Sequence, residues 1–524
     1  MNARTFHDLT THTPYSVRAG GHTLDWDIKP FPFKVYTDTP VVALPRAFHP
    51  IAADTLTAIA ASGEAHGEAS APLTLERLAT VLYLSAGVTK KKVYGQGVEV
   101  LFRAAASTGA LYQTELYVAA GDVSDLAPGL YHFCPGDFTL RRLRDEDVRG
   151  ALAHAAATGD LRDRAAVLIV TAIYWRNTWK YQARGFRHLF WDSGTMLANV
   201  LAASSALDLA PRLLTGFVDD EVNHVLGIDA HHETALELVA LGGAHRSETP
   251  TRAAEAEAEA THELPPIAHE TMPLSSSEVD YLALREMVEA SKLATSRDVL
   301  TWRGGRLRGP APPARTRRFV GTLVQLPAPR ARSGRALSDT IQRRGSTREF
   351  SHAPISDEEL ATVLWAATRP IPADVPSGLV ELFVIVNAVD GAAPGAYVYR
   401  PAPDAPAKEH ALELIRAGAL RDDAAYLTLE QRLGGDAAAT IFFLAPLDAI
   451  IERWGERGYR LANLEAGLAG GRAYLAAYAL GFGASGLTFY DRHVVEFFAP
   501  ASDGLDAIFV TALGRSVRTP ARSA

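Results

Sequence analysis

Three arginines, a glycine and two hydroxyl-bearing residues lie together in the segment RRGSTREF, residues 343–350. The segment directly precedes ISDEELATVL, which has the pattern of a helix. Guanidinium groups donate paired hydrogen bonds to phosphate oxygens, and a hydroxyl and free backbone N–H groups add further donors. Taken alone, the segment is also compatible with a solvated basic turn. We interpret it as a candidate phosphate-binding turn.

A second glycine-rich segment, GFGASG at residues 481–486, matches the G-x-G-x-x-G pattern of dinucleotide-binding proteins. In those proteins a strand precedes the glycines, and the helix that follows them receives the pyrophosphate at its N-terminus. Here the helix-forming RAYLAAYAL comes before the glycines, and the strand-like LTFY comes after them. This order predicts a helix that ends at a glycine, followed by a loop that passes close to other backbone.

The 524-residue chain has 48% hydrophobic and 21% charged residues, which is the composition of a folded protein with more than one domain. Its 52 basic and 60 acidic residues give a net charge of −8, so no general basic field favours nucleic acid or anionic membranes. The one cysteine, Cys134, cannot form an internal disulfide. The start lacks a signal core and no run of about 18 residues is apolar throughout, so we expect a cytoplasmic protein with no membrane association.

The chain contains two copies of one sequence pattern. At an offset of 282 residues, APLTLERLATVLYLSAG (71–87) aligns with APISDEELATVLWAATR (353–369) without a gap. Further pairs follow in the same order at slightly shorter offsets: DLAPGLYHF with GAAPGAYVY, ARGFRHLFWDSG (183–194) with ERGYRLANLEAG (456–467), and VALG (239–242) with TALG (511–514). We infer two domains, residues 1–248 and 279–524, joined by an Ala-, Glu-, Pro- and Ser-rich linker at 249–278.

Each copy combines helix and strand patterns. LERLATVLYLSAG spaces its leucines as an amphipathic helix, whereas TELYVAAGD (114–122) and VELFVIVNA (380–388) alternate as strands do. GTMLANVLAASSAL (194–207) and GLAGGRAYLAAYAL (467–480) have a helical period and many small residues, so they must pack closely against a neighbour. The expected fold class is α+β, a sandwich with a buried central helix in each copy.

Five segments together resemble the nitroreductase superfamily, specifically its SagB-type branch of flavin-dependent azoline dehydrogenases. They are RAAASTGALYQTELYV (103–118), APGLYHF (127–133), WKYQARGFR (179–187), RRGSTREF and GFGASGLTFYD (481–491). LDWDIKPFPFKVY (24–36) is similar to the segment that precedes the flavin domain in that branch, so residues 1–40 are assigned to a prelude of the first domain. The resemblance implies two tandem nitroreductase-like domains that form an intramolecular pseudo-dimer with FMN at their interface.

In such a pair one domain supplies the arginine-rich turn and the other supplies the S-x-G-A-L-Y loop. Opposite Arg343, Arg344, Ser346 and Arg348, the first copy has Ala61, Ser62, Glu64 and His66, and a carboxylate there repels phosphate. Conversely, the second copy has the shorter SGLVELFV (377–384) in place of STGALYQTELYV. One complete composite site remains, and we expect one FMN per chain. It combines the second copy's turn with Arg103, Ser107, Gly109, Ala110, Leu111 and Tyr112 of the first copy.

The resemblance assigns roles to further residues. The backbone of Ser485, Gly486 and Leu487 is expected to approach the isoalloxazine near its N5, and Arg515 is expected to contact the phosphate. Lys180 and Tyr181 occupy the position of the Lys-Tyr pair that the resemblance implies to be catalytic, where the second copy has Arg453 and Trp454. The pair is therefore retained on the copy that also retains the STGALY loop.

The implied reaction explains why a Lys-Tyr pair would be needed. Turning an azoline into an azole removes a proton from one ring carbon and a hydride from its neighbour, and the flavin accepts the hydride. A base must accept the proton. A neighbouring Lys⁺ lowers the pKa of a tyrosine, and desolvation lowers the pKa of a lysine, so either residue could be that base.

We therefore expect an FMN-dependent dehydrogenase that acts on thiazoline or oxazoline rings in a ribosomally made peptide, with a cyclodehydratase as partner. Two alternatives remain open: an NAD(P)H-dependent nitroreductase or quinone reductase, and a scaffold or peptide-binding subunit without activity. The Lys-Tyr pair and the prelude argue against the first, and the complementary losses argue against the second. A small-molecule substrate, and either a monomeric pseudo-dimer or a higher homo-oligomer, are also compatible with the sequence.

Other conspicuous residues are interpreted more simply. Lys90, Lys91 and Lys92 are expected to form a solvated face rather than a contact to a leader peptide or a phosphate. His231, His232 and Glu233 are expected to lie at the surface without a metal. The arginines Arg184, Arg187, Arg457 and Arg460 recur in both copies and are expected to serve the shared fold or the interface.

Overall fold

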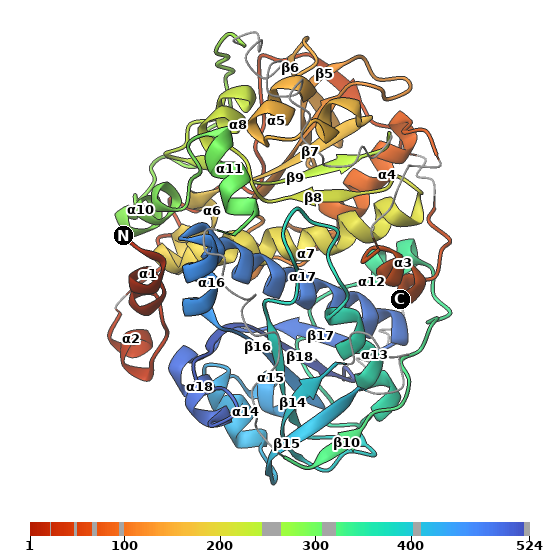
Figure 1. Cartoon of the computed structure of the whole chain (residues 1–524), viewed down its shortest axis with the longest axis vertical. Helices are drawn as coiled ribbons and strands as arrows, with labels where there is room; N and C mark the ends of the chain where they lie inside the picture. Colours follow the sequence, from red (N-terminus) through yellow and green to blue (C-terminus); the bar gives the residue numbers. More distant parts are fainter. Residues whose placement is uncertain are drawn as a thin grey trace.

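The computed structural model describes residues 1–20, 22–46, 50–64, 71–93, 99–243, 264–305, 321–401 and 410–517. Two seven-stranded antiparallel sheets with the same strand order stand above and below a central helical layer (Figure 1). The first sheet runs β1 (Val41–Ala43), β6 (Thr139–Arg144), β5 (Gly129–Cys134), β4 (Thr114–Ala120), β7 (Ala166–Ile173), β9 (Glu233–Leu241) and β8 (Arg212–Leu214). The second runs β10 (Leu323–Gln325), β15 (Ala411–Ala417), β14 (Gly395–Arg400), β12 (Glu381–Val386), β16 (Ala439–Ala445), β18 (Asp506–Gly514) and β17 (Gly483–Gly486).

The helices repeat between the copies as the strands do. In the first copy they are α3 (Thr55–Ala61), α4 (Leu75–Ala86), α5 (Arg149–Ala155), α6 (Tyr174–Tyr181), α7 (Gly185–Ala206) and α8 (Asp219–Leu226). In the second they are α12 (Leu337–Arg343), α13 (Asp357–Ala367), α14 (Arg421–Leu427), α15 (Arg432–Asp436), α16 (Leu447–Trp454), α17 (Arg457–Leu480) and α18 (Asp491–Phe498). The expected α+β duplication is confirmed, and within the described residues no helix combines the length and apolarity needed to cross a membrane.

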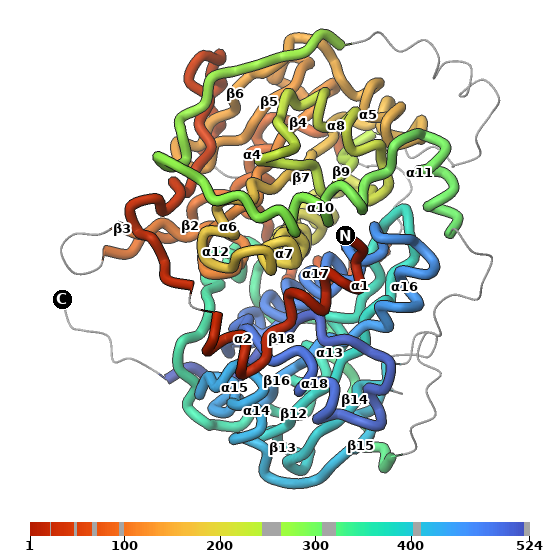
Figure 2. Tube along the Cα trace, turned by 90° about the vertical axis from the view of Figure 1, so that its left-hand side faces the viewer, coloured from red at the N-terminus to blue at the C-terminus, as the bar shows by residue number. Residues whose placement is uncertain are grey.

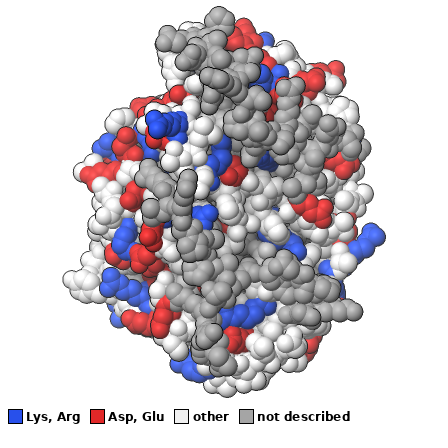
Figure 3. Space-filling view, viewed as in Figure 1, with Lys and Arg blue, Asp and Glu red and all other residues white. Residues whose placement is uncertain are grey.

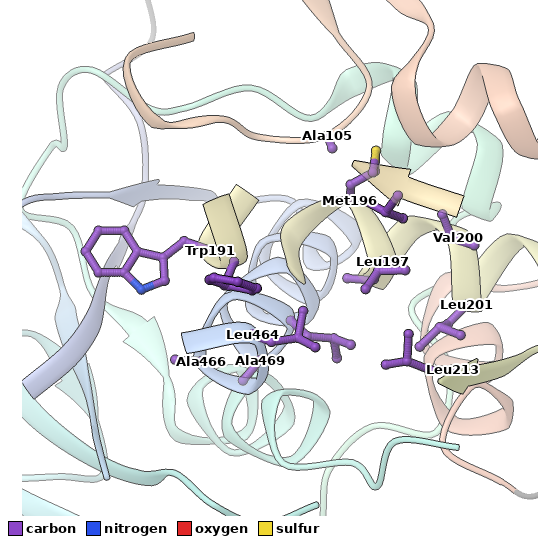
Figure 4. Packing of buried hydrophobic residues seen from close by; sticks show 14 of the residues in the cluster. Ala105, Trp191, Met196, Leu197, Val200, Leu201, Leu213, Leu464, Ala466 and Ala469 are labelled. Atoms are coloured by element: carbon purple, nitrogen blue, oxygen red, sulfur yellow. The ribbon is translucent and has the colours of Figure 1, made fainter. Parts of the chain in front are cut away.

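The central layer consists of α7 and α17, which cross at two equivalent glycines. A Cβ atom built on Gly194 would lie 2.5 Å from the backbone nitrogen of Leu468, and one built on Gly467 would lie 2.5 Å from the carbonyl oxygen of Trp191. Trp191 and Leu197 of α7 and Leu464 of α17 belong to the one buried hydrophobic cluster that includes both helices (Figure 4). The close packing expected from the small residues of both helices is therefore packing of the two copies against each other.

Each copy is also clasped by a helical segment that belongs to the other copy. The N-terminal helices α1 (Ala3–Leu9) and α2 (Pro14–Ala19) lie along the second copy, whereas α10 (Leu282–Ala290) and α11 (Ser296–Arg303) lie along the first (Figure 2). Arg4 of α1 donates to both carboxylate oxygens of Asp506 at 2.8 Å, and Arg303 of α11 donates to the carbonyl of Ala156 at 2.7 Å. The exchange ties the two copies together at their outer faces.

The recurring arginines form a buried cluster in each copy. Arg184 and Arg187, at the start of α7, bind the carboxylate of Asp491 in the second copy. Arg457 and Arg460, at the start of α17, bind Asp219 in the first. Their expected role in the fold and interface is confirmed.

The predicted linker is partly packed. Residues 249–263 lie outside the described residues, but residues 264–278 run beside the N-terminal segment. Phe31 donates its backbone N–H to the carbonyl of Leu274 at 2.7 Å, and Met272 donates to Val35 at 2.9 Å. Residues 264–278 of the predicted linker therefore pair through their backbone with the N-terminal segment. Acidic and basic side chains are interspersed over the described surface on the face seen in Figure 3.

Candidate active site at the interface of the two copies

The arginine-rich turn follows α12 and leads to β11 (Ile355–Ser356). Its backbone is attached to the edge strand β17, because Thr347 donates its N–H to the carbonyl of Ala484 at 3.0 Å. Arg343 and Arg348 are exposed, and neither guanidinium forms a hydrogen bond or ion pair with another described residue. Two guanidinium groups are thus free to bind an anion on either side of Ser346.

Arg344 has a different environment from its neighbours. Its buried guanidinium donates to the carbonyl oxygens of Arg103 at 2.9 Å and Ala104 at 2.8 Å, which belong to the first copy. Arg103 is itself braced, because it donates to the carbonyls of Thr114 and Pro32 and lies over the ring of Tyr112. Burial lowers the pKa of Arg103 to about 10. In the described structure these two predicted cofactor ligands join the copies and shape the site wall.

The loop at residues 107–112 is held by a buried carboxylate on α7. Asp192 accepts hydrogen bonds from the Ser107 hydroxyl and from the backbone N–H and hydroxyl of Thr108. Gly109, Ala110 and Tyr112 have positive φ angles of 64°, 54° and 52°, and Leu111 lies between them. Burial raises the pKa of Asp192 to about 6, although its hydrogen bonds act in the opposite direction. Asp192 therefore fixes an unusual backbone path that the sequence motif alone does not explain.

Lys180 and Tyr181 end helix α6 beside this loop. A Cβ atom built on Gly109 would lie 2.9 Å from the hydroxyl of Tyr181, so the glycine permits a close approach. The Lys180 ammonium lies 5.3 Å from the centre of the Tyr181 ring. The pair is thus in contact with the loop that the first copy retained.

The charges around the pair come from both copies. Burial, and then the positive charge of Arg348 in the second copy, lower the pKa of Lys180. Burial and the nearby Asp192 raise the pKa of Tyr181. The sequence left open which residue is the base, and these environments favour a neutral lysine amine and a protonated tyrosine.

Strand β17 contributes the opposite side of the site. Its helix α17 ends at Gly481, which has a φ angle of 91°, as the reversed order of helix and strand predicted. The hydroxyl of Ser485 is buried without a hydrogen-bond partner, and Gly486 donates its N–H to the Tyr474 hydroxyl. Leu487 follows, half-buried.

Sequence reasoning missed two tyrosines of this site. The Tyr474 hydroxyl lies 3.4 Å from that of Ser346, and the Tyr478 hydroxyl lies 3.3 Å from that of Thr347. Because the two tyrosines are four residues apart on α17, they lie on the same helix face. That spacing, just before GFGASG, is the signal that could have identified them.

Arg515 lies beside the turn, and its backbone carbonyl accepts the N–H of Ser351 at 2.9 Å. Its guanidinium donates to both oxygens of Glu359 at 2.8 Å. Its predicted phosphate contact would therefore compete with a carboxylate that also caps α13.

At the complementary position the first copy's turn, which lacks the arginines, would meet the second copy's shortened loop. Backbone of the protein occupies this position. Strand β8 is the counterpart of β17. Leu213 pairs with Val239 and Gly486 pairs with Thr511. Because Val239 and Thr511 are equivalent in the two copies, Leu213 is the counterpart of Gly486. Leu213 donates to the carbonyl of Pro372 at 2.8 Å, and Asp374 donates back to Leu213 at 3.1 Å.

The Asp374 carboxylate completes the closure. It accepts the N–H groups of Thr215 at 2.9 Å and Gly216 at 3.0 Å, and it is paired with Arg303. Arg472 meanwhile donates to the hydroxyl of Ser62, the counterpart of Arg344. His66 lies outside the described residues. The edge of β8 is therefore covered at Leu213 by residues 372–374 of the second copy.

Comparison with known proteins identifies the family of the chain. Residues 341–515 match the model of the nitroreductase family. A protein of Methanocaldococcus jannaschii that bears a nitroreductase name is 34% identical over 160 residues, which is 30% of this chain and 77% of that protein. A crystal structure of a protein from Anabaena variabilis that is named as a nitroreductase is 27% identical to this chain. The match covers 98% of this chain and 99% of that chain, with a TM-score of 0.75. A structure from Exiguobacterium sibiricum, solved in complex with FMN, is 11% identical, with 38% and 92% coverage and a TM-score of 0.26.

The chain belongs to the nitroreductase family and is a flavoprotein oxidoreductase. Members of this family bind FMN. The residues present fit that cofactor: two unpaired guanidiniums flank Ser346 at an anion site, and the small residues Gly483–Gly486 form an edge strand with a buried hydroxyl that lacks a partner. Arg343, Ser346 and Arg348 would hold the phosphate, and β17 and the 107–112 loop would enclose the ring system.

Proposed function

We propose that this protein is an FMN-dependent dehydrogenase that oxidises azoline rings in a ribosomally made peptide to azoles. The observation that carries the proposal is the juxtaposition of Lys180 and Tyr181 with Arg348 of the other copy, beside the loop at Gly109. A lysine with a lowered pKa, set against the cofactor's phosphate turn, suits proton abstraction from a ring held next to a hydride acceptor.

In this proposal the protein's own residues carry the proton chemistry. The neutral amine of Lys180 takes the proton from one ring carbon as a hydride leaves the neighbouring carbon. The Tyr181 hydroxyl, which stays protonated, donates a hydrogen bond to the substrate. FMN, when bound, supplies the hydride acceptor. The electron pair of the C–H bond that loses its proton becomes the new ring double bond, and the electron pair of the other C–H bond leaves with the hydride.

We also propose one FMN per chain. At the complementary position, Pro372 already pairs with the backbone of Leu213, and the Asp374 carboxylate accepts the N–H of Gly216. These groups would compete with a flavin ring for the same place. The substrate rings would be formed in the cytoplasm by a cyclodehydratase, which is the partner we propose.

The names of the relatives favour a second candidate, an NAD(P)H-dependent nitroreductase. Steady oxidation of NAD(P)H with a nitroaromatic acceptor, together with no mass loss from azoline peptides, would establish that function instead.

The first test is flavin quantitation on the purified chain. We expect a flavin-to-protein ratio near one, which Arg343→Ala lowers. A ratio near two would contradict the single site, and a colourless protein would contradict every enzymatic function proposed here.

The second test concerns the catalytic pair. A peptide with preformed azolines should lose two hydrogen atoms per ring with the wild type. Lys180→Ala should retain FMN and abolish this loss, whereas Lys91→Ala, a matched change on a lysine paired only with Glu99, should not. Normal turnover by Lys180→Ala would refute the assignment.

A further inference from the structure

The first copy carries a hairpin that the second copy lacks. Between the helix and the loop that the copies share, the first copy has residues 88–106, including strands β2 (Val88–Val93) and β3 (Glu99–Arg103). The second copy has only residues 370–376 there, and these cover β8. The candidate site beside β17 and the complementary position beside β8 thus differ by this insertion.

Lys90, on β2, reaches from the hairpin into the other copy. Its ammonium donates to the carbonyl oxygens of Arg343 at 2.8 Å and Arg344 at 2.6 Å. Lys90 therefore binds the backbone at the point where α12 ends and the arginine-rich turn begins. A Cβ atom built on Gly345 would lie 3.8 Å from the Lys90 nitrogen and 3.5 Å from the Tyr478 hydroxyl, so lysine and tyrosine flank the same glycine. The expectation that Lys90 belongs to a solvated face is wrong.

We propose that Lys90 is a positioning residue for the phosphate group of FMN, supplied by the first copy to the turn of the second. The inference rests on the FMN site proposed above and does not depend on which substrate is oxidised. By fixing two successive carbonyls, Lys90 holds the backbone from which Arg343, Ser346 and Arg348 project, and it adds a positive charge to the anion site.

The local electrostatics support this role. Burial and the positive charges of Arg344 and Lys92 lower the pKa of Lys90 to about 8. Lys90 therefore lies near the positive side chains of Arg344 in the second copy and Lys92 in its own strand. A phosphate would supply a negative charge beside them.

The neighbouring lysine provides a matched control. Lys91 points to the other side of the same strand, is half-exposed, and pairs with Glu99 at 2.5 Å within the hairpin. Lys91→Met therefore removes the same charge from the same strand without touching the turn.

The test compares the binding of FMN and of riboflavin, which lacks the phosphate, to the apoprotein of the full chain. Lys90→Met should raise the Kd of FMN about tenfold, because a charged donor to two carbonyls is lost. The Kd of riboflavin should stay nearly unchanged. Lys90→Arg should recover much of the FMN affinity, and Lys91→Met should match the wild type for both ligands.

The outcomes separate this inference from the proposed function. If Lys90→Met binds FMN as the wild type does, or weakens FMN and riboflavin equally, the assignment to the phosphate is overturned. If Lys90→Met does not fold, Lys90→Gln decides in its place: a folded Lys90→Gln that binds FMN as tightly as the wild type does would overturn it too. Wild-type protein that binds no FMN would refute the proposed site itself.

Discussion

The guanidinium of Arg187 and the carboxylate of Asp491 come from opposite copies and lie 2.5 Å apart in the interior. Arg457 and Asp219 repeat this contact at 2.5 Å across the same interface. Each pair is completed by a second arginine, so each buried carboxylate faces two positive charges. The interface is therefore fixed by charge as well as by the packing of α7 against α17.

Removing one carboxylate should strongly destabilise the chain. Asp491→Asn leaves Arg184 and Arg187 buried without a counter-charge, and we expect a loss of about 3–5 kcal/mol in the free energy of unfolding. Denaturant titration measures it. Asp448→Asn, which alters an exposed partner of Arg4, is the control and should change stability by less than about 1 kcal/mol. Equal effects of the two substitutions would contradict the role given to the buried cluster.

The helix crossing should tolerate no side chain. Gly194→Ala places a methyl group against the backbone of α17, and overpacking of this kind costs about 1–3 kcal/mol or more. Gly150→Ala, in α5, has open space around the new methyl and should be neutral or stabilising. Thermal or chemical unfolding of both variants checks the contrast, and a harmless Gly194→Ala would show that the helices separate easily.

Asp192 should make stability depend on pH in a particular direction. Its folded pKa of about 6 lies above the ordinary aspartate value of about 3.9, so the folded state binds the proton more tightly. Stability should therefore fall as the pH rises from about 4 to 6, by about 3 kcal/mol in order of magnitude. The free energy of unfolding of the wild type, compared with that of Asp192→Asn across this range, isolates the contribution. Parallel curves would contradict it.

The rate of substrate oxidation should rise with pH as Lys180 loses its proton. Because burial and Arg348 lower its pKa, the rate should level off below the ordinary lysine value of about 10.4. Arg348→Gln removes a positive charge and should move the profile of kcat/KM to higher pH, measured at saturating FMN. A pH profile that does not move would show that Arg348 does not lower the pKa of the catalytic base.

Much of this arrangement could be predicted from the sequence because duplication makes equivalent positions comparable. The small residues around Gly194 and Gly467 predicted close packing, and the reversed order around Gly481 excluded a dinucleotide fold. The loss of Arg343 and its neighbours from one copy, and of the STGALY loop from the other, predicted one composite site, which stays a prediction.

The features that escaped prediction depend on contacts between distant segments. Lys90 belongs to a run that has the composition of a surface strand, and only the other copy's carbonyls reveal its environment. The closure of β8 depends on the length of the 370–376 connection, which carries no motif. The exchange of α1 and α10 leaves little trace in the sequence because their side chains differ. Each helix nevertheless presents a carbonyl to an equivalent arginine, α1 to Arg187 and α10 to Arg460.

The segment at Pro372–Asp374 has a consequence for how such a site can change over time. In a symmetric homodimer every substitution occurs twice, so a residue that blocks one cleft blocks the other as well. Covalent fusion removes that obligation, and one cleft can be given up while its twin is elaborated. In this chain the two positions differ in that way, with the segment at Pro372–Asp374 covering β8 on one side and Lys90 contacting the arginine-rich turn on the other.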